Sequence, residues 1–149
     1  MNATGIVRRN DDLGRVVIPK EIRRTLRIRE GDPLEIFTDR EGEIILKKYS
    51  PIGELGTLAK LYAESLSQTL GCTVCVTDTD QIVAASGSGK KDLQDQFIGR
   101  DFEYALKERS QILASAGDSS YIKVTADMKD YKNEAVCPII CEGDVIGSV

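Results

Sequence analysis

The first residues with evident chemistry are the basic side chains of positions 8–29. This segment carries eight cations and only three anions, although the whole chain of 149 residues is acidic, with 20 Lys+Arg against 24 Asp+Glu. Seven of the eight cations are arginines, whose planar guanidinium can contact phosphate or guanine with two hydrogen bonds. The pattern indicates a surface for nucleic acid, and a solvated charged face is the alternative. The cations are Arg8, Arg9, Arg15, Lys20, Arg23, Arg24, Arg27 and Arg29.

Catalytic chemistry has little support in the composition. The chain has no histidine, which excludes Ser-His-Asp and Cys-His catalysis and histidine-ligated zinc. No other acid–base or nucleophile–base pair is evident. The segment 84–91 (AASGSGKK) resembles a phosphate-binding loop but lacks its first glycine and its final Ser/Thr, so a flexible basic loop is expected. We therefore expect neither an enzyme nor a cofactor.

The four cysteines could in principle form a zinc site. Cys72 and Cys75 form one pair, and Cys137 and Cys141 form a second pair with a longer spacing. Both pairs fall in expected strands, where Cys72 and Cys75 would point to opposite faces, which does not suit one tetrahedral ion. We expect buried structural thiols and no metal, with zinc binding and redox sensing as alternatives.

The charge is divided between two regions. Residues 1–50 have a balance of +2 and residues 51–149 a balance of −6, which together give the net charge of −4. The longest apolar run, Ala135–Cys141, is far too short to cross a membrane, and the N-terminus lacks the apolar core of a signal peptide. We expect a cytoplasmic protein with a basic module followed by an acidic one.

The basic module reads as short strands around one helix. Pro19 suits the start of that helix, and Ser50-Pro51 is the expected boundary of a domain at residues 1–51. A module of this size buries too little apolar surface to be stable alone, so we expect two copies to share one core. The expected elements are strands at Thr4–Arg9, Arg15–Ile18, Leu34–Thr38 and Glu43–Tyr49, and a helix at Lys20–Leu26.

The acidic module begins with a connecting helix at residues 52–70. Its stripe of Leu55, Leu58, Tyr62, Leu66 and Leu70 is expected to be core, with pairing to a second copy as the alternative. Residues 71–149 then alternate between strand and helix patterns, which indicates an α+β sheet domain. The expected elements are strands at Thr73–Thr77, Ile82–Ser86, Tyr121–Thr125, Glu134–Cys141 and Val145–Val149, with helical spacing across Leu93–Leu113.

Residues 3–49 closely resemble the DNA-binding module of the AbrB/MazE/SpoVT family. The resemblance is strongest over LGRVVIPKEIRRTL (Leu13–Leu26) and GDPLEIF (Gly31–Phe37). It implies an N-terminal swapped-hairpin β-barrel in which two chains interleave and bind double-stranded DNA. The family's DNA-gripping arginines map onto Arg8, Arg15, Arg23 and Arg24, and Arg9 stands where relatives carry a basic residue.

The remainder resembles the C-terminal domain of the family's sporulation regulators, through SGSGKKD (Ser86–Asp92), Pro138–Ile140 and the hairpin ending at Gly147. The resemblance implies a GAF-like domain at residues 71–149, further assembly into tetramers, and activation or repression of late sporulation genes in the forespore. It also implies that such a domain continues beyond Val149, so we expect the domain to be incomplete here. A MazE-like antitoxin and a regulator responding to an unknown small-molecule effector are the alternatives.

Overall fold

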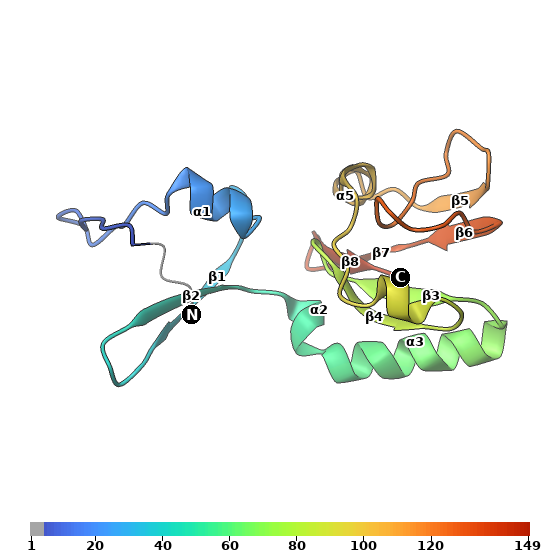
Figure 1. The fold of residues 1–149 in the computed structure, drawn as a ribbon, viewed down its shortest axis with the longest axis horizontal. Coiled ribbons are helices and arrows are strands. Elements are labelled where there is room, and N and C mark those ends of the chain that lie inside the picture. Colours follow the sequence, from blue (N-terminus) through green and yellow to red (C-terminus); the bar gives the residue numbers. More distant parts are fainter. Residues whose placement is uncertain (1–4) are drawn as a thin grey trace. The chain divides into compact units, whose positions relative to one another are not determined.

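The chain is described here by a computed structural model that places residues 5–149 (Figure 1). It divides into two compact units, with the boundary between Tyr49 and Ser50. We call residues 1–49 unit 1 and residues 50–149 unit 2.

Unit 1 is built from one short helix and one hairpin. Helix α1 spans Lys20–Thr25 and follows Pro19, as expected for a proline at a helix start. Strands β1 (Leu34–Thr38) and β2 (Ile44–Lys48) pair antiparallel, with Ile36 opposite Leu46. The side chain of Asp39 closes the hairpin by accepting hydrogen bonds from the backbone N–H of Glu41 and Glu43, at 2.9 and 2.8 Å. The helix and both hairpin strands were predicted from the sequence and are confirmed.

The two other strands predicted for unit 1 are wrong for the single chain. Residues 5–9 and Arg15–Ile18 lie in irregular structure, and Thr4 lies outside the described residues. A strand persists only when a neighbouring strand takes up its backbone hydrogen bonds. Within residues 5–49 the structure supplies such a partner to β1 and β2 alone.

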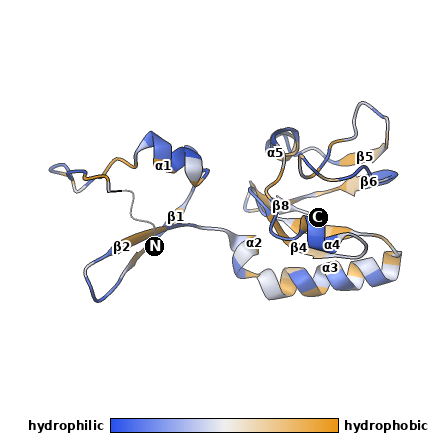
Figure 2. Cartoon of the chain, viewed as in Figure 1, coloured by the Kyte–Doolittle hydropathy of each residue, from blue (hydrophilic) through white to orange (hydrophobic). Residues whose placement is uncertain are grey.

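Within residues 5–49 the structure shows no cluster of buried apolar side chains. Both clusters of buried apolar residues in the described chain belong to unit 2. In the β1–β2 hairpin, Ile36 is 69% exposed, and Phe37 and Ile44 are also exposed. The orange colour of these strands in Figure 2 marks their hydrophobic residues. Val7, Val16 and Val17 are likewise exposed.

Unit 2 contains a four-stranded antiparallel sheet in the order β4-β3-β8-β7 and a separate β5–β6 pair (Figure 1). Gly147 permits the close approach of β8 to β3, because a Cβ at this position would overlap the carbonyl oxygen of Thr77. The helices are α2 (Pro51–Glu54), α3 (Gly56–Leu70), α4 (Lys90–Leu93) and α5 (Arg100–Lys107). The strands are β3 (Val74–Thr77), β4 (Ile82–Ser86), β5 (Ile112–Ser115), β6 (Asn133–Val136), β7 (Pro138–Cys141) and β8 (Asp144–Ser148).

Two buried clusters hold unit 2 together. One lies under α3, which contacts β3 and β4, and includes Ala63, Val76 and Ala84. The other surrounds Phe102 of α5, which is 1% exposed. These clusters give unit 2 the interior that unit 1 lacks.

The expectation that the large residues of the connecting helix form core is wrong. The helix is interrupted at Leu55, between α2 and α3, and α3 buries the small residues Ala59, Ala63 and Ser67. Small side chains let the helix axis approach the sheet closely, and Ser67 also donates a hydrogen bond to the carbonyl of Cys72 at 2.7 Å. The larger residues of the connecting helix are not buried: Leu55, Leu58, Leu61, Tyr62, Leu66 and Leu70 are all exposed.

Three predicted elements of residues 71–149 differ from the structure. The helical pattern over Leu93–Leu113 yields α4 and α5 only, and Leu113 lies in β5. The strand expected at Glu134–Cys141 is divided at Cys137 into β6 and β7.

The strand expected at Tyr121–Thr125 is absent from the structure because its backbone donors go to side chains. The N–H of Ile122 donates to the Glu134 carboxylate at 2.6 Å. The N–H groups of Val124 and Thr125 point at the Met128 sulfur, at 3.2 and 3.5 Å. With those donors used, no strand ladder can form there.

Candidate nucleic-acid interface

Arg15 leaves a tight turn that Asp11 organises. The carboxylate of Asp11 accepts hydrogen bonds from the backbone N–H of Leu13 (3.0 Å) and Arg15 (2.8 Å), and Gly14 supplies the positive φ of 74°. The Arg15 side chain also donates to Asp11 at 2.7 Å, yet it remains 72% exposed. The backbone and side-chain hydrogen bonds from Arg15 lower the pKa of Asp11. This hydrogen-bonded turn presents the Arg15 side chain to solvent.

Arg23 and Arg24 are presented by α1. Both lie in the last turn of this helix and are exposed. The Nε of Arg23 donates to the carbonyl of Ile18 at 3.1 Å, which ties the helix to the segment before it. Arg8 and Arg9 are exposed in the irregular segment before the Asp11 turn. The five predicted arginines therefore come from three local structures of unit 1.

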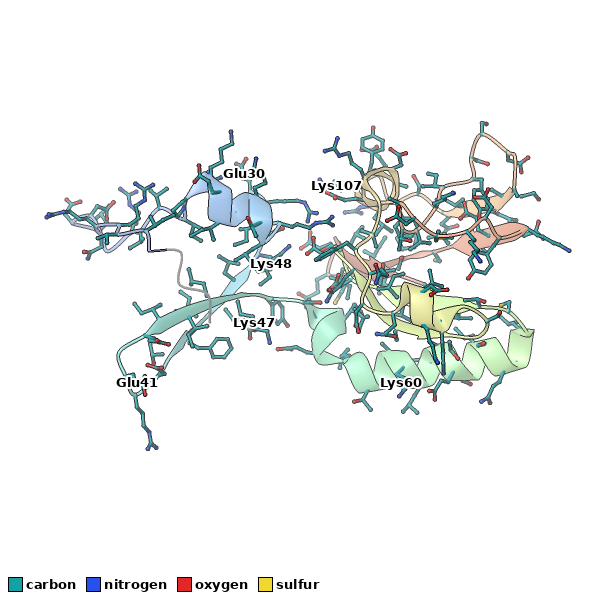
Figure 3. The ribbon with its side chains drawn as sticks, viewed as in Figure 1. Glu30, Glu41, Lys47, Lys48, Lys60 and Lys107 are labelled. Carbon is teal, nitrogen blue, oxygen red and sulfur yellow. The ribbon has the colours of Figure 1, made fainter. Side chains whose placement is uncertain are left out.

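Some cations of the basic segment have a structural place instead. Arg27 and Arg29 are half-buried. Lys48 of β2, which sequence reasoning did not single out, donates to the carbonyl of Arg27 at 2.8 Å and pairs with Asp32 at 3.3 Å. Lys48 thus fastens the segment after α1 to the hairpin. Lys47, the preceding residue of β2, points to the opposite face of the strand, because successive side chains alternate between the two faces (Figure 3).

The cysteines are not the buried thiols that were expected. Cys72, Cys137 and Cys141 are exposed, and Cys75 alone is half-buried. Burial raises the pKa of the Cys75 thiol to about 11, which disfavours the thiolate needed for metal binding.

Across residues 5–149, the side chains that could share a metal ion are Asp39, Glu41 and Glu43, all exposed at the β1–β2 turn. Glu41 lies at the tip of this hairpin in Figure 3. The Asp39 carboxylate already serves the turn, and exposed acidic groups of this kind are common without an ion.

The remaining motifs of unit 2 have structural explanations. The phosphate-loop-like segment forms the end of β4 and the start of α4. Asp78 organises a turn, accepting from the N–H of Asp80 and Gln81 at 2.7 and 2.8 Å. Among the residues that were placed, none of the helices has the length and apolar character needed to span a bilayer.

Comparison with known families defines the class of protein. Residues 54–149 match the family described as "Stage V sporulation protein T C-terminal, transcription factor". Residues 7–54 match "Antidote-toxin recognition MazE, bacterial antitoxin". Together with the exposed arginines of unit 1, these matches define a DNA-binding transcription regulator of sporulation.

Individual relatives identify the family. The chain is 56% identical to "Stage V sporulation protein T" of Bacillus subtilis (strain 168) over all its residues, which cover 83% of that protein. The chain belongs to the stage V sporulation protein T family.

Unit 1 has relatives of its own. Over 51 residues, 34% of this chain and 52% of the relative, the chain is 67% identical to "Transition state regulatory protein AbrB" of the same organism. A solution structure of the N-domain of the transcription factor abrB is 67% identical over 34% of this chain and 96% of that one, with a TM-score of 0.32. The relatives named here are regulators, not enzymes.

Proposed function

We propose that unit 1 binds double-stranded DNA as a homodimer in which two chains interleave their hairpins into one swapped-hairpin β-barrel. The observation that carries the proposal is the exposed apolar surface of unit 1, since Ile36, Phe37 and Ile44 have no core of their own. A second copy would cover these side chains and give the segments around Val7 and Val17 strands to pair with.

The arginines would act on the phosphate backbone first. Arg8, Arg9, Arg15, Arg23 and Arg24 are exposed, and a dimer would double them into a two-fold surface. Phosphate contacts position a protein on DNA, whereas guanidinium groups that reach a groove edge read bases. Each phosphate contact adds about −0.9 to the log–log salt slope.

Substitution at α1 tests this surface. Arg24→Ala is expected to weaken DNA binding about tenfold. It should also reduce the magnitude of the log–log salt slope by about 0.9, the contribution of one phosphate contact, and leave the dimer intact. Arg23→Ala should act similarly, although it also removes the hydrogen bond to Ile18. Arg40→Ala, in the acidic β1–β2 turn, is the matched control. Full affinity of both α1 variants in a gel shift at moderate salt would refute the proposed surface.

Unit 2 would assemble and tune the DNA-binding dimer. We propose that it is a GAF-like domain, and that the regulator activates some forespore genes and represses others in the forespore cytoplasm, without catalysis or a cofactor. The exposed large residues of α3 support a second self-association surface, through which two dimers would form a tetramer. An effector of unit 2 would be a small molecule.

A MazE-like antitoxin is the second candidate, because residues 7–54 match the MazE description. An antitoxin would co-purify with a toxin encoded beside it. Unit 2 favours the regulator, since residues 54–149 match a transcription-factor family.

A further inference from the structure

The turn at residues 11–15 holds the backbone of Arg15 through one residue, Asp11. The backbone N–H of Asp11 donates to the carbonyl of Arg15 at 3.1 Å, and its own carbonyl accepts from the N–H of Gly14 at 3.1 Å. Oδ1 of Asp11 accepts from the N–H of Arg15 at 2.8 Å and from that of Leu13 at 3.0 Å. Both backbone polar groups of Arg15 are therefore bonded to Asp11.

The second carboxylate oxygen of Asp11 contacts the Arg15 side chain. Oδ2 accepts a hydrogen bond from Nε of Arg15 at 2.7 Å. The Arg15 side chain is 72% exposed and that of Asp11 38% exposed. An ion pair at this exposure contributes little to the stability of a fold, because water screens it. Its main consequence is the orientation that it gives to the guanidinium group.

The bond at Nε determines which edge of the guanidinium faces away from the turn. A guanidinium group carries five N–H donors in one plane, one on Nε and two on each Nη. With Nε directed at Asp11, Nη1 and Nη2 lie at the far end of the side chain. Two parallel N–H groups from that end match two acceptors side by side, such as two phosphate oxygens or O6 and N7 of guanine.

The Asp11 carboxylate has two opposite effects on the binding of an anion by Arg15. A long side chain loses rotamer freedom when it binds, which weakens affinity, and a side chain that is already oriented loses less. The negative charge of Asp11, in contrast, repels phosphate. Neutralisation of this carboxylate therefore shows which effect is larger.

We propose that Asp11 is a positioning residue for DNA binding, which holds the Arg15 guanidinium with Nη1 and Nη2 directed at a pair of acceptors on DNA. The benefit of this orientation exceeds the repulsion between the Asp11 charge and DNA phosphate. The inference rests on the proposed function, because it takes Arg15 to contact DNA. It adds to the arginine surface an acidic residue whose loss weakens the binding of a polyanion.

The test is Asp11→Asn in the full chain. Asparagine keeps a carbonyl oxygen for the N–H groups of Leu13 and Arg15 but puts an amide in place of the second carboxylate oxygen. DNA affinity at fixed moderate salt should fall about fivefold, the scale of ordering one long side chain. Asp12→Asn, the matched control, removes the same charge from the next, exposed residue, and should leave affinity unchanged or raise it. Unchanged or tighter binding by Asp11→Asn would overturn the proposal.

A double-mutant cycle with Arg15→Ala separates positioning from a merely structural role. In the Arg15→Ala chain, Asp11→Asn should no longer weaken binding, because the side chain that it orients is gone. An equal loss in both backgrounds would assign Asp11 to the stability of the turn and overturn the inference. Full affinity of Arg15→Ala alone would refute both the inference and the place of Arg15 in the proposed DNA surface. A weakened Arg15→Ala beside a tightly binding Asp11→Asn would refute the positioning role alone.

Two duplexes identify the acceptor. If Arg15 contacts phosphate, Asp11→Asn should lose the same factor on a duplex of A·T pairs as on one that contains G·C pairs. If it contacts guanine, the loss should be confined to the duplex with G·C pairs. Either pattern supports the positioning role, and no loss on either duplex contradicts it.

Discussion

Units 1 and 2 use similar elements and reach opposite states. Both contain short helices and antiparallel hairpins, yet unit 2 buries Phe102 and Ile82 completely, whereas unit 1 exposes Ile36 and Val17. A chain of about 50 residues encloses little volume relative to its surface, so it buries a small fraction of its apolar residues. The difference teaches that unit 2 carries its own interior and that residues 5–49 leave large apolar side chains exposed, as the proposed shared core requires.

The two units also differ in charge, and the basic unit is the one proposed to bind DNA. Unit 1 carries the five exposed arginines of the proposed DNA surface, while the rest of the chain has a balance of −6. An acidic unit 2 would restrain non-specific contact with DNA through repulsion of phosphate. Dimerisation and DNA affinity are therefore expected to depend on unit 1, and the free energy of unfolding on unit 2.

The largest effect is expected from emptying the core of unit 2. Phe102→Ala should lower the free energy of unfolding by about 3–5 kcal/mol, because it leaves a cavity among Ile98, Leu106 and Ile112. Equilibrium unfolding in denaturant measures the change. Tyr104→Ala, on the exposed side of the same helix, should cost less than about 0.5 kcal/mol. Equal losses would show that unit 2 does not depend on this cluster.

A second variant addresses the shared core of unit 1. Ile36→Asp places a charge where the partner copy would cover Ile36 and Leu46, so dimerisation should fail and DNA affinity should fall about 30-fold, equivalent to about 2 kcal/mol. Light scattering and a salt-titrated binding assay measure the two effects. Glu35→Gln on the same strand is the control. If the variant still forms a dimer with full DNA affinity, Ile36 does not belong to a shared core of unit 1.

Substitutions on the exposed face of α3 should change stability little and the mass of the oligomer clearly. Leu58→Glu with Tyr62→Glu should halve the mass of a tetramer and leave the unfolding temperature nearly unchanged, because both side chains are exposed in the single chain. Lys60→Glu, on the same helix (Figure 3), is the control. An unchanged mass in the double variant would place the second interface elsewhere.

The smallest effect concerns Glu134. Burial raises the pKa of its carboxyl above the ordinary 4.5, against the opposing hydrogen bond from Ile122, and its second oxygen is buried without a hydrogen-bond partner in the structure. A raised pKa contributes stability at low pH that is lost as pH rises from about 4.5 through the pKa of the folded protein.

Glu134→Gln should remove that dependence, with a gain below about 1 kcal/mol at neutral pH. Thermal unfolding across this pH range measures it. A variant with the same pH dependence as the parent chain would assign the effect to another group.

Much of the local structure could be predicted from the sequence. Proline at position 19 and the strand patterns of β1 and β2 are local signals, and the corresponding elements are present. The basic segment could also be recognised from the sequence. The sequence did not predict that Arg23 and Arg24 are exposed whereas Arg27 and Arg29 are half-buried. The contact of Lys48 with the Arg27 carbonyl joins residues 21 positions apart, which no local pattern could predict.

The sequence by itself determined α1, the β1–β2 hairpin and the division of charge between the two units. Only the tertiary structure decided which face of α3 is buried. Leu58 and Tyr62 recur at the same helical spacing as Ala59 and Ala63, so periodicity alone could not choose between the two stripes. The small residues face the sheet, because they let the backbone of α3 pack closely against β3 and β4 without leaving empty space.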